Sequence, residues 1–308
     1  MATLLYYCIL LPVSKLPLRI IYGISRVFYV LAYRVFGYRT KVVRTNIRAS
    51  FPDWSEAEVD GQVEKFYRYF FDSVAESIKL FSMSEEESIE RCRVVNPELI
   101  APYAEANRSV MVVGAHYANW EIAALSFPLI FERQTVMGIY SPLKNEAMDT
   151  LVRENRQRTG VHLVSRRVVD EYYEEDPVRP SIDFFVADQS PSNHVWQKIH
   201  WTTFLNQTTG FLAGPERYAV RNNIPVFYMN LRIINRGHYA AELTPITLHP
   251  RETSPGAITE AFARTLEQEI LRNPTPWLWT HRRWKRDVPE EVTQLLKEQS
   301  FVGPEYSR

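Results

Sequence analysis

A histidine and a glutamate five positions apart, His116 and Glu121, are the residues of this chain best suited to catalysis. A carboxylate can hold one ring nitrogen of histidine protonated, which leaves the other nitrogen free to accept a proton. The pair therefore indicates general-base chemistry. Within one helix, this spacing would turn the two side chains roughly 140° apart. We therefore expect His116 in a turn and Glu121 in the first turn of the next helix, where the helix dipole favours an ionised carboxylate.

The residues before the histidine predict a buried strand that delivers it to this turn. An apolar run, 110–113, is followed by Gly114 and Ala115. In open α/β sheets, functional side chains collect at the carboxyl ends of the strands. This rule groups His116 with Tyr140, which ends a second apolar run, and with Asp188, which follows a third. We expect the three residues to meet in one crevice.

Two basic clusters could bind the charged parts of a substrate. Arg156 and Arg158 lie on the predicted helix after Tyr140, where they form either a solvated basic face or a grip for phosphate. A further alternative is that Arg156 and Arg283 only pair with carboxylates such as Glu121 or Asp188 and so stabilise the fold. Residues 274–286 interleave three tryptophans with His281, Arg283 and further basic residues. That mixture fits contact with phosphate and lipid, so we expect Arg283 to meet lipid headgroups or to support the site from behind. The other histidines are expected to be structural: His162, His194, His200, His238 and His249.

Composition excludes several classes of protein. The 308 residues include only two cysteines, which excludes a disulfide framework and a cysteine-rich zinc site. The net charge of zero argues against a general nucleic-acid binder. The sequence contains no Walker loop, dinucleotide glycine fingerprint, HExxH helix or Gly-x-Ser-x-Gly elbow. We therefore expect neither a metal nor a cofactor.

The charge is distributed unevenly along the chain. Residues 1–52 contain eight basic residues and no acidic one, whereas residues 53–308 contain 28 basic and 36 acidic residues. A helix beginning near Pro17 would place Arg19, Arg26 and Arg34 within an arc of about 80° on an otherwise apolar cylinder. Such a helix is typical of the interface of an anionic membrane.

Two other readings of the N-terminal segment stay open. The first is a helix that packs in the core of a soluble protein. The second is a tilted helix that spans the membrane from about Leu4, although Lys15 and the arginines make a simple span awkward. A signal peptide is disfavoured because neither a charged region before the apolar run nor a small-residue cleavage site is clear.

After residue 52, strands and helices alternate. A capping box at 55–58 opens a helix that reaches about residue 81, and a second capping box at 84–87 opens a short one. Apolar runs predict strands at 109–113, 135–140, 182–187 and 224–231. Helices are predicted at 119–131, 145–159, 167–175, 208–222, 257–272 and 289–300. This order predicts an α/β fold with a mostly parallel sheet flanked by helices, behind a helical, membrane-associated N-terminus.

Motifs in this order resemble the bacterial lipid A biosynthesis (late) acyltransferases, a family of lysophospholipid-acyltransferase type. The resemblance covers nearly the whole chain. Its motifs here are YRTKVVRTNIRASFP, HYANWE, YSP, NRQRTG, VADQ, FLNQTTG and LWTHRRWK. HYANWE matches the family's pattern of histidine, four residues and an acid. The segments SPSNHVWQKIHWTTF and FLAGPERYAVRNN depart from the family's usual pattern.

The resemblance implies an O-acyltransferase at the cytoplasmic face of the bacterial inner membrane. The enzyme would transfer a fatty acyl chain from an acyl carrier protein thioester to a hydroxyl of a lipid A precursor. His116 would act as general base with Glu121 as its partner, and 53–308 would form the acyltransferase domain behind a membrane-associating segment, 1–52. The residues assigned to substrate binding are Tyr140, Arg156, Arg158, Asp188, His281 and Arg283.

Two alternatives remain at this level. The chain could acylate another membrane glycolipid or an aminolipid. It could also be a membrane-binding protein that keeps the fold without catalysis, although the intact pair of His116 and Glu121 counts against this.

Overall fold

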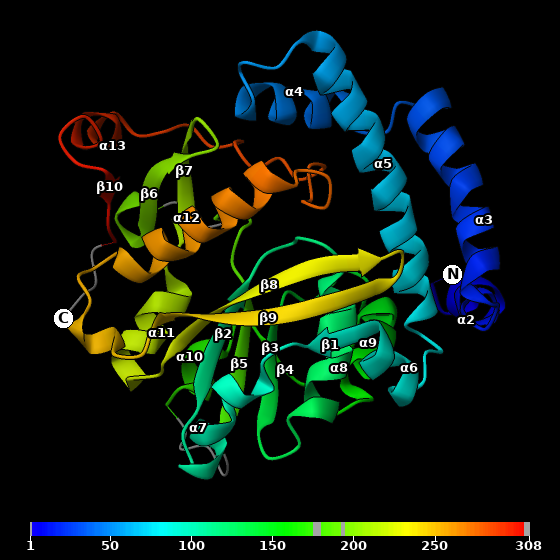
Figure 1. The fold of residues 1–308 in the computed structure, drawn as a ribbon, viewed down its shortest axis with the longest axis horizontal. Helices are drawn as coiled ribbons and strands as arrows, with labels where there is room; N and C mark the ends of the chain where they lie inside the picture. Colours follow the sequence, from blue (N-terminus) through cyan, green and yellow to red (C-terminus); the bar gives the residue numbers. More distant parts are fainter. Residues whose placement is uncertain (1, 175–179, 192–194, 305–308) are drawn as a thin grey trace.

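A seven-stranded sheet lies at the centre of the computed structural model, which describes residues 2–174, 180–191 and 195–304 (Figure 1). The strand order is β1-β9-β8-β2-β5-β3-β4, and all neighbouring pairs are parallel except β8 and β9. The strands are β1 Cys92–Val94, β2 Val110–Gly114, β3 Thr135–Tyr140, β4 His162–Ser165, β5 Ser181–Val186, β8 Val226–Asn235 and β9 His238–Thr247. The predicted α/β class with a mostly parallel sheet is confirmed.

The centre of this sheet is where the sequence pattern was most apolar. All five residues of β2 are buried between β5 and β8, and five of the six residues of β5 are buried. Such strands have no water-facing side, so their sequences read as continuous apolar runs. The four strands expected from those runs are present. The short β1 and β4 and the mixed sequence of β9 carried no comparable signal.

A second sheet corrects one predicted helix. Three antiparallel strands lie in the order β10-β6-β7, with bounds β6 Ile199–Phe204, β7 Gln207–Leu212 and β10 Phe301–Val302. The helix expected over 208–222 is therefore wrong in its first part, since α11 covers only Gly214–Asn222. Gly210 lies opposite Trp201, and a Cβ there would lie 2.8 Å from Ile199 Cγ2. The glycine lets the two strands approach closely.

The helices of the body agree better with the prediction. The capping box of α5 (Glu56–Lys79) is present in both directions, between Ser55 and Glu58. At α6 (Glu85–Arg91) the Ser84 side chain accepts from the backbone N–H of Glu87. The others are α7 Ala101–Glu105, α8 Trp120–Ile130, α9 Glu146–Gln157, α10 Val169–Tyr172, α12 Ala257–Arg272 and α13 Glu290–Leu295, with 3₁₀ turns η3 Pro97–Leu99, η4 Trp196–Lys198 and η5 Pro250–Glu252. Part of the helix expected over 167–175, at residue 175, and His194 lie outside the described residues.

The N-terminal helices pack alongside α5 (Figure 1). They are α1 Ala2–Leu5, η1 Tyr6–Leu10, α2 Leu11–Ser14, α3 Leu18–Tyr29, η2 Val30–Val35 and α4 Thr40–Ser50. Ile21 and Tyr22 of α3 are buried against Ala75 of α5. Among the described residues, no single helix is long and apolar enough to cross a membrane. One pair, Leu18–Val35 with Thr40–Ser50, passes that test on length and composition and is bent by 81°.

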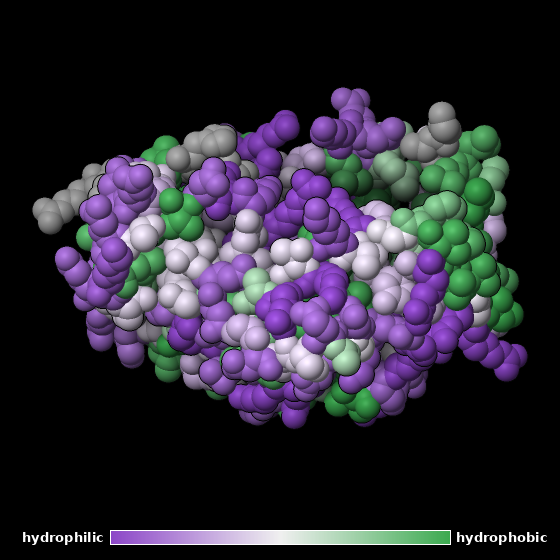
Figure 2. All heavy atoms as spheres, turned by 90° about the horizontal axis from the view of Figure 1, so that it is seen from above, coloured by the Kyte–Doolittle hydropathy of each residue, from purple (hydrophilic) through white to green (hydrophobic). Residues whose placement is uncertain are grey.

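The outer side of these helices is apolar. Of the 22 large hydrophobic side chains that are exposed in the described residues, twelve lie between residues 4 and 38. They include Phe28, which is 57% exposed, and Phe36, which is 78% exposed. Figure 2 shows hydrophobic residues gathered at the end of the molecule where these helices lie. We call the exposed side chains of residues 4–38 the N-terminal apolar face. A patch of this kind is unusual on a monomeric soluble protein.

Candidate active site

The turn that carries His116 follows directly from the buried end of β2. The main chain of this turn is tied to a second segment, because Leu278 N–H donates to the His116 carbonyl (3.1 Å) and Ala118 N–H donates to the Pro276 carbonyl (3.2 Å). Ala118 adopts a left-handed conformation with φ of 53°. A non-glycine residue in that region is strained, and such strain is often found at functional sites. The strand, the turn and the 276–278 segment together fix where the imidazole lies.

Asp188 is the carboxylate that contacts the imidazole. His116 Nδ1 lies 2.6 Å from Asp188 Oδ1, and the same oxygen accepts from the backbone N–H of His116 at 3.0 Å. The other oxygen, Oδ2, accepts from the indole N–H of Trp277 at 2.9 Å. Asp188 follows β5, the neighbour of β2, so parallel strands bring the two residues to one edge of the sheet.

These contacts keep Asp188 ionised although it is buried. Burial by itself raises the pKa of this carboxyl, but the positive charge of His116 and the hydrogen bonds from His116 and Trp277 lower the pKa to about 2. An ionised Asp188 accepts the Nδ1 proton of a neutral imidazole, so Nε2 carries the lone pair. In this tautomer Nε2, the ring nitrogen that does not contact Asp188, is able to accept a proton.

Glu121 has a different partner from the one expected. As predicted, it lies in the first turn of α8, which Asn119 precedes as N-cap. Its carboxylate, however, binds Arg156 of α9 through both oxygens, with 2.8 Å between Arg156 Nε and Oε2. The predicted direct pairing of Glu121 with His116 is therefore wrong. Trp120 stands at the start of the same helix turn and packs edge-on against the imidazole, with ring centroids 4.6 Å apart.

The other residues assigned to the site lie at varying distances from this centre. His281 is brought close, since its Nε2 accepts from the backbone N–H of Ser190 at 3.2 Å. Burial lowers the pKa of His281 to about 4, because the positive charge of Arg283 adds to this effect and the charge of Asp188 opposes it only in part. The ring of His281 is therefore neutral near pH 7. Tyr140 ends β3, as expected, with its backbone carbonyl bonded to Arg166 N–H. Arg158 donates to the carbonyl of Leu80 at the end of α5.

Arg283 lies inside the protein, where it cannot meet a lipid headgroup. Its side chain donates to the Gly210 carbonyl at 2.8 Å and stacks over the Phe211 ring at 4.5 Å. Burial lowers the pKa of its guanidinium to about 10. Of the two roles expected for Arg283, support of the site from behind is the one its position allows.

Three further residues shape this centre: Gln189 and Trp277, which lie in segments expected to contribute to the site, and Glu76, which was not expected there. Gln189 places its side-chain amide 3.0 Å from His116 Nε2, and Trp277 donates to Asp188. Glu76, 2% exposed on α5, accepts from the side-chain amide of Asn119 at 2.9 Å. A signal for Glu76 was available, because it continues the three-and-four spacing of the buried face of α5 where an apolar residue would be expected.

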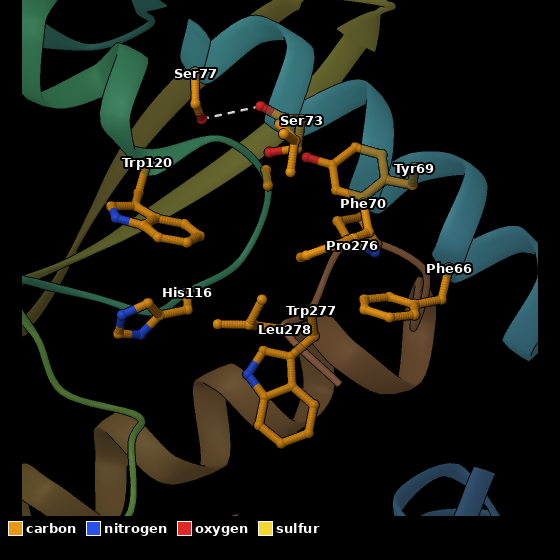
Figure 3. A pocket seen from close by; sticks show the side chains of 12 residues that line it. Phe66, Tyr69, Phe70, Ser73, Ser77, His116, Trp120, Pro276, Trp277 and Leu278 are labelled. Carbon is orange, nitrogen blue, oxygen red and sulfur yellow. Dashed lines mark hydrogen bonds between the residues drawn. The ribbon is translucent and has the colours of Figure 1, made fainter. Parts of the chain in front are cut away.

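An apolar pocket opens beside His116. Figure 3 shows side chains of α5 facing His116 and Trp120 across it. Aromatic and aliphatic groups dominate the lining: Phe66, Phe70, Val74, Trp120, Pro276, Trp277 and Leu278. The lining of the pocket has the polarity of a site for an apolar ligand group. Among the described residues, no group of three or more His, Cys, Asp or Glu is arranged to hold a metal ion.

Comparisons with known proteins agree on one family. The family model described as bacterial lipid A biosynthesis acyltransferase matches residues 1–286. A lipid A biosynthesis lauroyltransferase of Escherichia coli is 24% identical over 280 residues, which is 89% of this chain and 88% of the relative. A palmitoleoyltransferase of the same pathway in E. coli is 21% identical over 253 residues, 80% of this chain and 79% of the relative. A lipid A biosynthesis acyltransferase of Haemophilus influenzae is 21% identical over 264 residues, 84% and 81% of the two chains.

Proposed function

Because the chain belongs to the bacterial lipid A biosynthesis acyltransferase family, we propose that it transfers a fatty acyl chain from an acyl carrier protein thioester to a hydroxyl of a lipid A precursor. The observation that supports this reaction best is the pairing of His116 Nδ1 with Asp188, which leaves Nε2 as a proton acceptor beside an apolar pocket. A hydroxyl is a weak nucleophile until a base accepts its proton, and an acyl chain needs an apolar wall.

The proposed step needs no covalent enzyme intermediate. The acceptor hydroxyl gives its proton to His116 Nε2 while its oxygen attacks the thioester carbonyl carbon. The carbonyl π electrons move onto the oxygen, and collapse of the tetrahedral intermediate breaks the carbon–sulfur bond. The departing thiolate takes the proton back from Nε2. Asp188 stabilises the imidazolium between these two transfers, as a buried carboxylate does in other histidine-based sites.

The remaining assigned residues are proposed to bind substrate around this centre. Arg156, oriented by Glu121, would meet negative charge at the rim of the site, and a planar guanidinium suits phosphate. Tyr140, Arg158 and His281 would border the bound substrates, and Arg283 would support the 281–286 segment. In this scheme Glu121 acts through Arg156 and not through the imidazole.

We also propose that residues 1–52 attach the acyltransferase domain, 53–308, to the cytoplasmic face of the inner membrane. The N-terminal apolar face and the excess of basic residues in this segment both suit an anionic lipid surface. The acceptor is itself a membrane lipid, so this attachment would keep the pocket near its substrate.

The test is acyl transfer by the purified full-length chain. Lauroyl acyl carrier protein is offered with a panel of acceptors that contains a lipid A precursor, another glycolipid and an aminolipid. We expect transfer to the lipid A precursor, and a loss of about 10²–10⁴-fold in kcat for His116→Ala and for Asp188→Asn. Thermal melts of both variants serve as the control for folding. Transfer to another acceptor alone, or near-normal turnover of His116→Ala, would contradict the proposal.

A further inference from the structure

Both ring nitrogens of His116 have partners in the structure. Nδ1 lies 2.6 Å from Asp188, and Nε2 lies 3.0 Å from the side-chain nitrogen of Gln189. An amide nitrogen can only donate, so this contact requires an unprotonated Nε2. Both contacts fit the same tautomer, with the proton on Nδ1 and the lone pair on Nε2.

Hydrogen bonds hold the residues on both sides of Gln189, whereas its side chain is held by one hydrogen bond among the described residues. Asp188 before it accepts three hydrogen bonds, two from His116 and one from Trp277. Ser190 after it donates its N–H to His281 Nε2 at 3.2 Å. Among the described residues, the hydrogen-bond partner of the Gln189 amide is His116 Nε2 alone. Rotation of this side chain breaks one hydrogen bond and leaves the loop in place.

The amide stands where the acceptor hydroxyl must bind. The single lone pair of Nε2 points in one direction, and a hydroxyl must approach along it to within about 3 Å to give up its proton. The carbonyl carbon under attack then lies about 3 to 3.5 Å from the hydroxyl oxygen. A group that contacts Nε2 before the hydroxyl arrives therefore lies next to the place where the carbonyl group must bind.

We propose that Gln189 is a catalytic residue, which caps His116 Nε2 in the empty site, yields this position to the acceptor hydroxyl and then donates its amide N–H to the acyl carbonyl oxygen. The inference rests on the proposed acyl transfer. Gln189 neither gains nor loses a proton in this step, and its N–H stabilises the negative charge that forms on the carbonyl oxygen. Donors aimed at such a developing charge are among the largest contributors to catalysis. The guanidinium of Arg156 is already bound by both oxygens of Glu121.

The first variant removes the donor. Gln189→Ala is expected to lower kcat by about 10²–10³-fold, as loss of one oxyanion donor does. The KM for the acceptor should stay the same or fall, because the hydroxyl no longer displaces the amide. Gln294→Ala is the matched control, since Gln294 is exposed on α13. A Gln189→Ala enzyme with wild-type kcat would overturn the proposal.

The second variant replaces the donor by an acceptor. In Gln189→Glu a carboxylate faces Nε2, so the imidazolium is stabilised and the acid limb of the pH–rate profile should move to higher pH by one unit or more. The other titratable or charged groups near the ring are Asp188, His281, Glu121 and Arg156, of which the last two bind each other. The variant leaves all four groups unchanged. A residue with only a structural role would change the melting temperature without moving this limb.

All variants are assayed as the full-length chain with lauroyl acyl carrier protein and a lipid A precursor, beside wild type and His116→Ala. Nitrogen NMR of histidine-labelled protein, with His116 assigned from its alanine variant, follows the ring without any turnover. If wild type transfers no acyl group, the proposed function fails, whatever the NMR spectrum shows. If wild type is active, His116→Ala is inactive and Gln189→Ala is unimpaired, only the assignment of Gln189 fails.

Discussion

At the scale of single residues, the site depends on which carboxylate binds which basic side chain. Two acids and two bases lie around the turn after β2, and the structure pairs His116 with Asp188 and Arg156 with Glu121. The difference matters for mechanism, because a carboxylate on Nδ1 sets the tautomer of the base, whereas a carboxylate on a guanidinium sets the direction of a fixed positive charge. The pattern of histidine, four residues and an acid therefore encodes two separate contacts.

A second buried carboxylate makes a prediction about stability and pH. Burial raises the pKa of Glu269 to about 7, from an ordinary value of 4.5, although Tyr228 donates to it and Arg272 lies nearby. The folded state therefore binds the proton more tightly than the unfolded state. The stability that this provides is complete below about pH 4.5 and is lost as the pH rises to about 7 and beyond.

We expect Glu269→Gln to remove this loss. The fall in free energy of unfolding between pH 5 and pH 8 should become smaller by about 2 to 3 kcal/mol than in wild type. Urea unfolding at pH 5 and pH 8 measures the free energy of unfolding of each protein. Because the change between the two pH values is compared between variant and wild type, any effect of the substitution that does not depend on pH cancels. Glu252→Gln, an exposed position, is the control. Equal pH dependence in Glu269→Gln and wild type would show that Glu269 titrates normally.

At the scale of elements, a single glutamate joins four parts of the fold. Glu76 of α5 accepts from Tyr22 of α3 (2.7 Å), from Asn119 before α8 (2.9 Å) and from Tyr239 of β9 (2.5 Å). Burial raises the pKa of its carboxyl, and these hydrogen bonds lower it again in part. Asn119 lies three residues after His116, so this contact links the N-terminal helices to the turn of the candidate base.

Truncation of this side chain should therefore be costly. Glu76→Ala leaves three buried donors without an acceptor, and we expect a loss of about 3–5 kcal/mol in the free energy of unfolding, measured with denaturant. Tyr22→Phe and Tyr239→Phe each remove one donor and should cost about 1 kcal/mol. A loss for Glu76→Ala no greater than that of either phenylalanine variant would show that the four elements are held together by other contacts.

At the scale of the whole molecule, the N-terminal helices have two different sides. One side is buried against α5, through residues such as Ile21 and Tyr22, and the other is the N-terminal apolar face. Deletion of the segment would therefore expose part of the core as well as remove the proposed membrane contact. Substitutions on the exposed side separate these two effects.

We expect the double variant Phe28→Glu with Leu31→Glu to lose most of its binding to vesicles of anionic lipid. Burial of a large apolar side chain contributes about 1.5–3 kcal/mol, and the new carboxylates are repelled by the surface. Co-sedimentation measures the bound fraction. Ile234→Glu with Leu271→Glu adds the same charge at exposed positions outside the face and should bind normally. Equal binding of both double variants would rule out the N-terminal apolar face as the membrane contact.

The family, the α/β class, the central strands and the place of His116 after β2 all follow from the amino-acid sequence alone. These features depend on local patterns, such as apolar runs, a capping box and ordered motifs, which act over a few residues. The strand pattern predicted that Asp188 and His116 share one crevice. Only the tertiary structure shows that Asp188, 72 positions away, binds the imidazole in place of Glu121, and that 207–212 forms a strand. Asp188 binds the basic side chain that folding brings next to it, which is His116. The strand β7 forms because residues 207–212 pair with β6. The spacing of neighbouring residues predicts neither the Asp188–His116 contact nor the strand β7, because both form only when separate segments of the chain pack together.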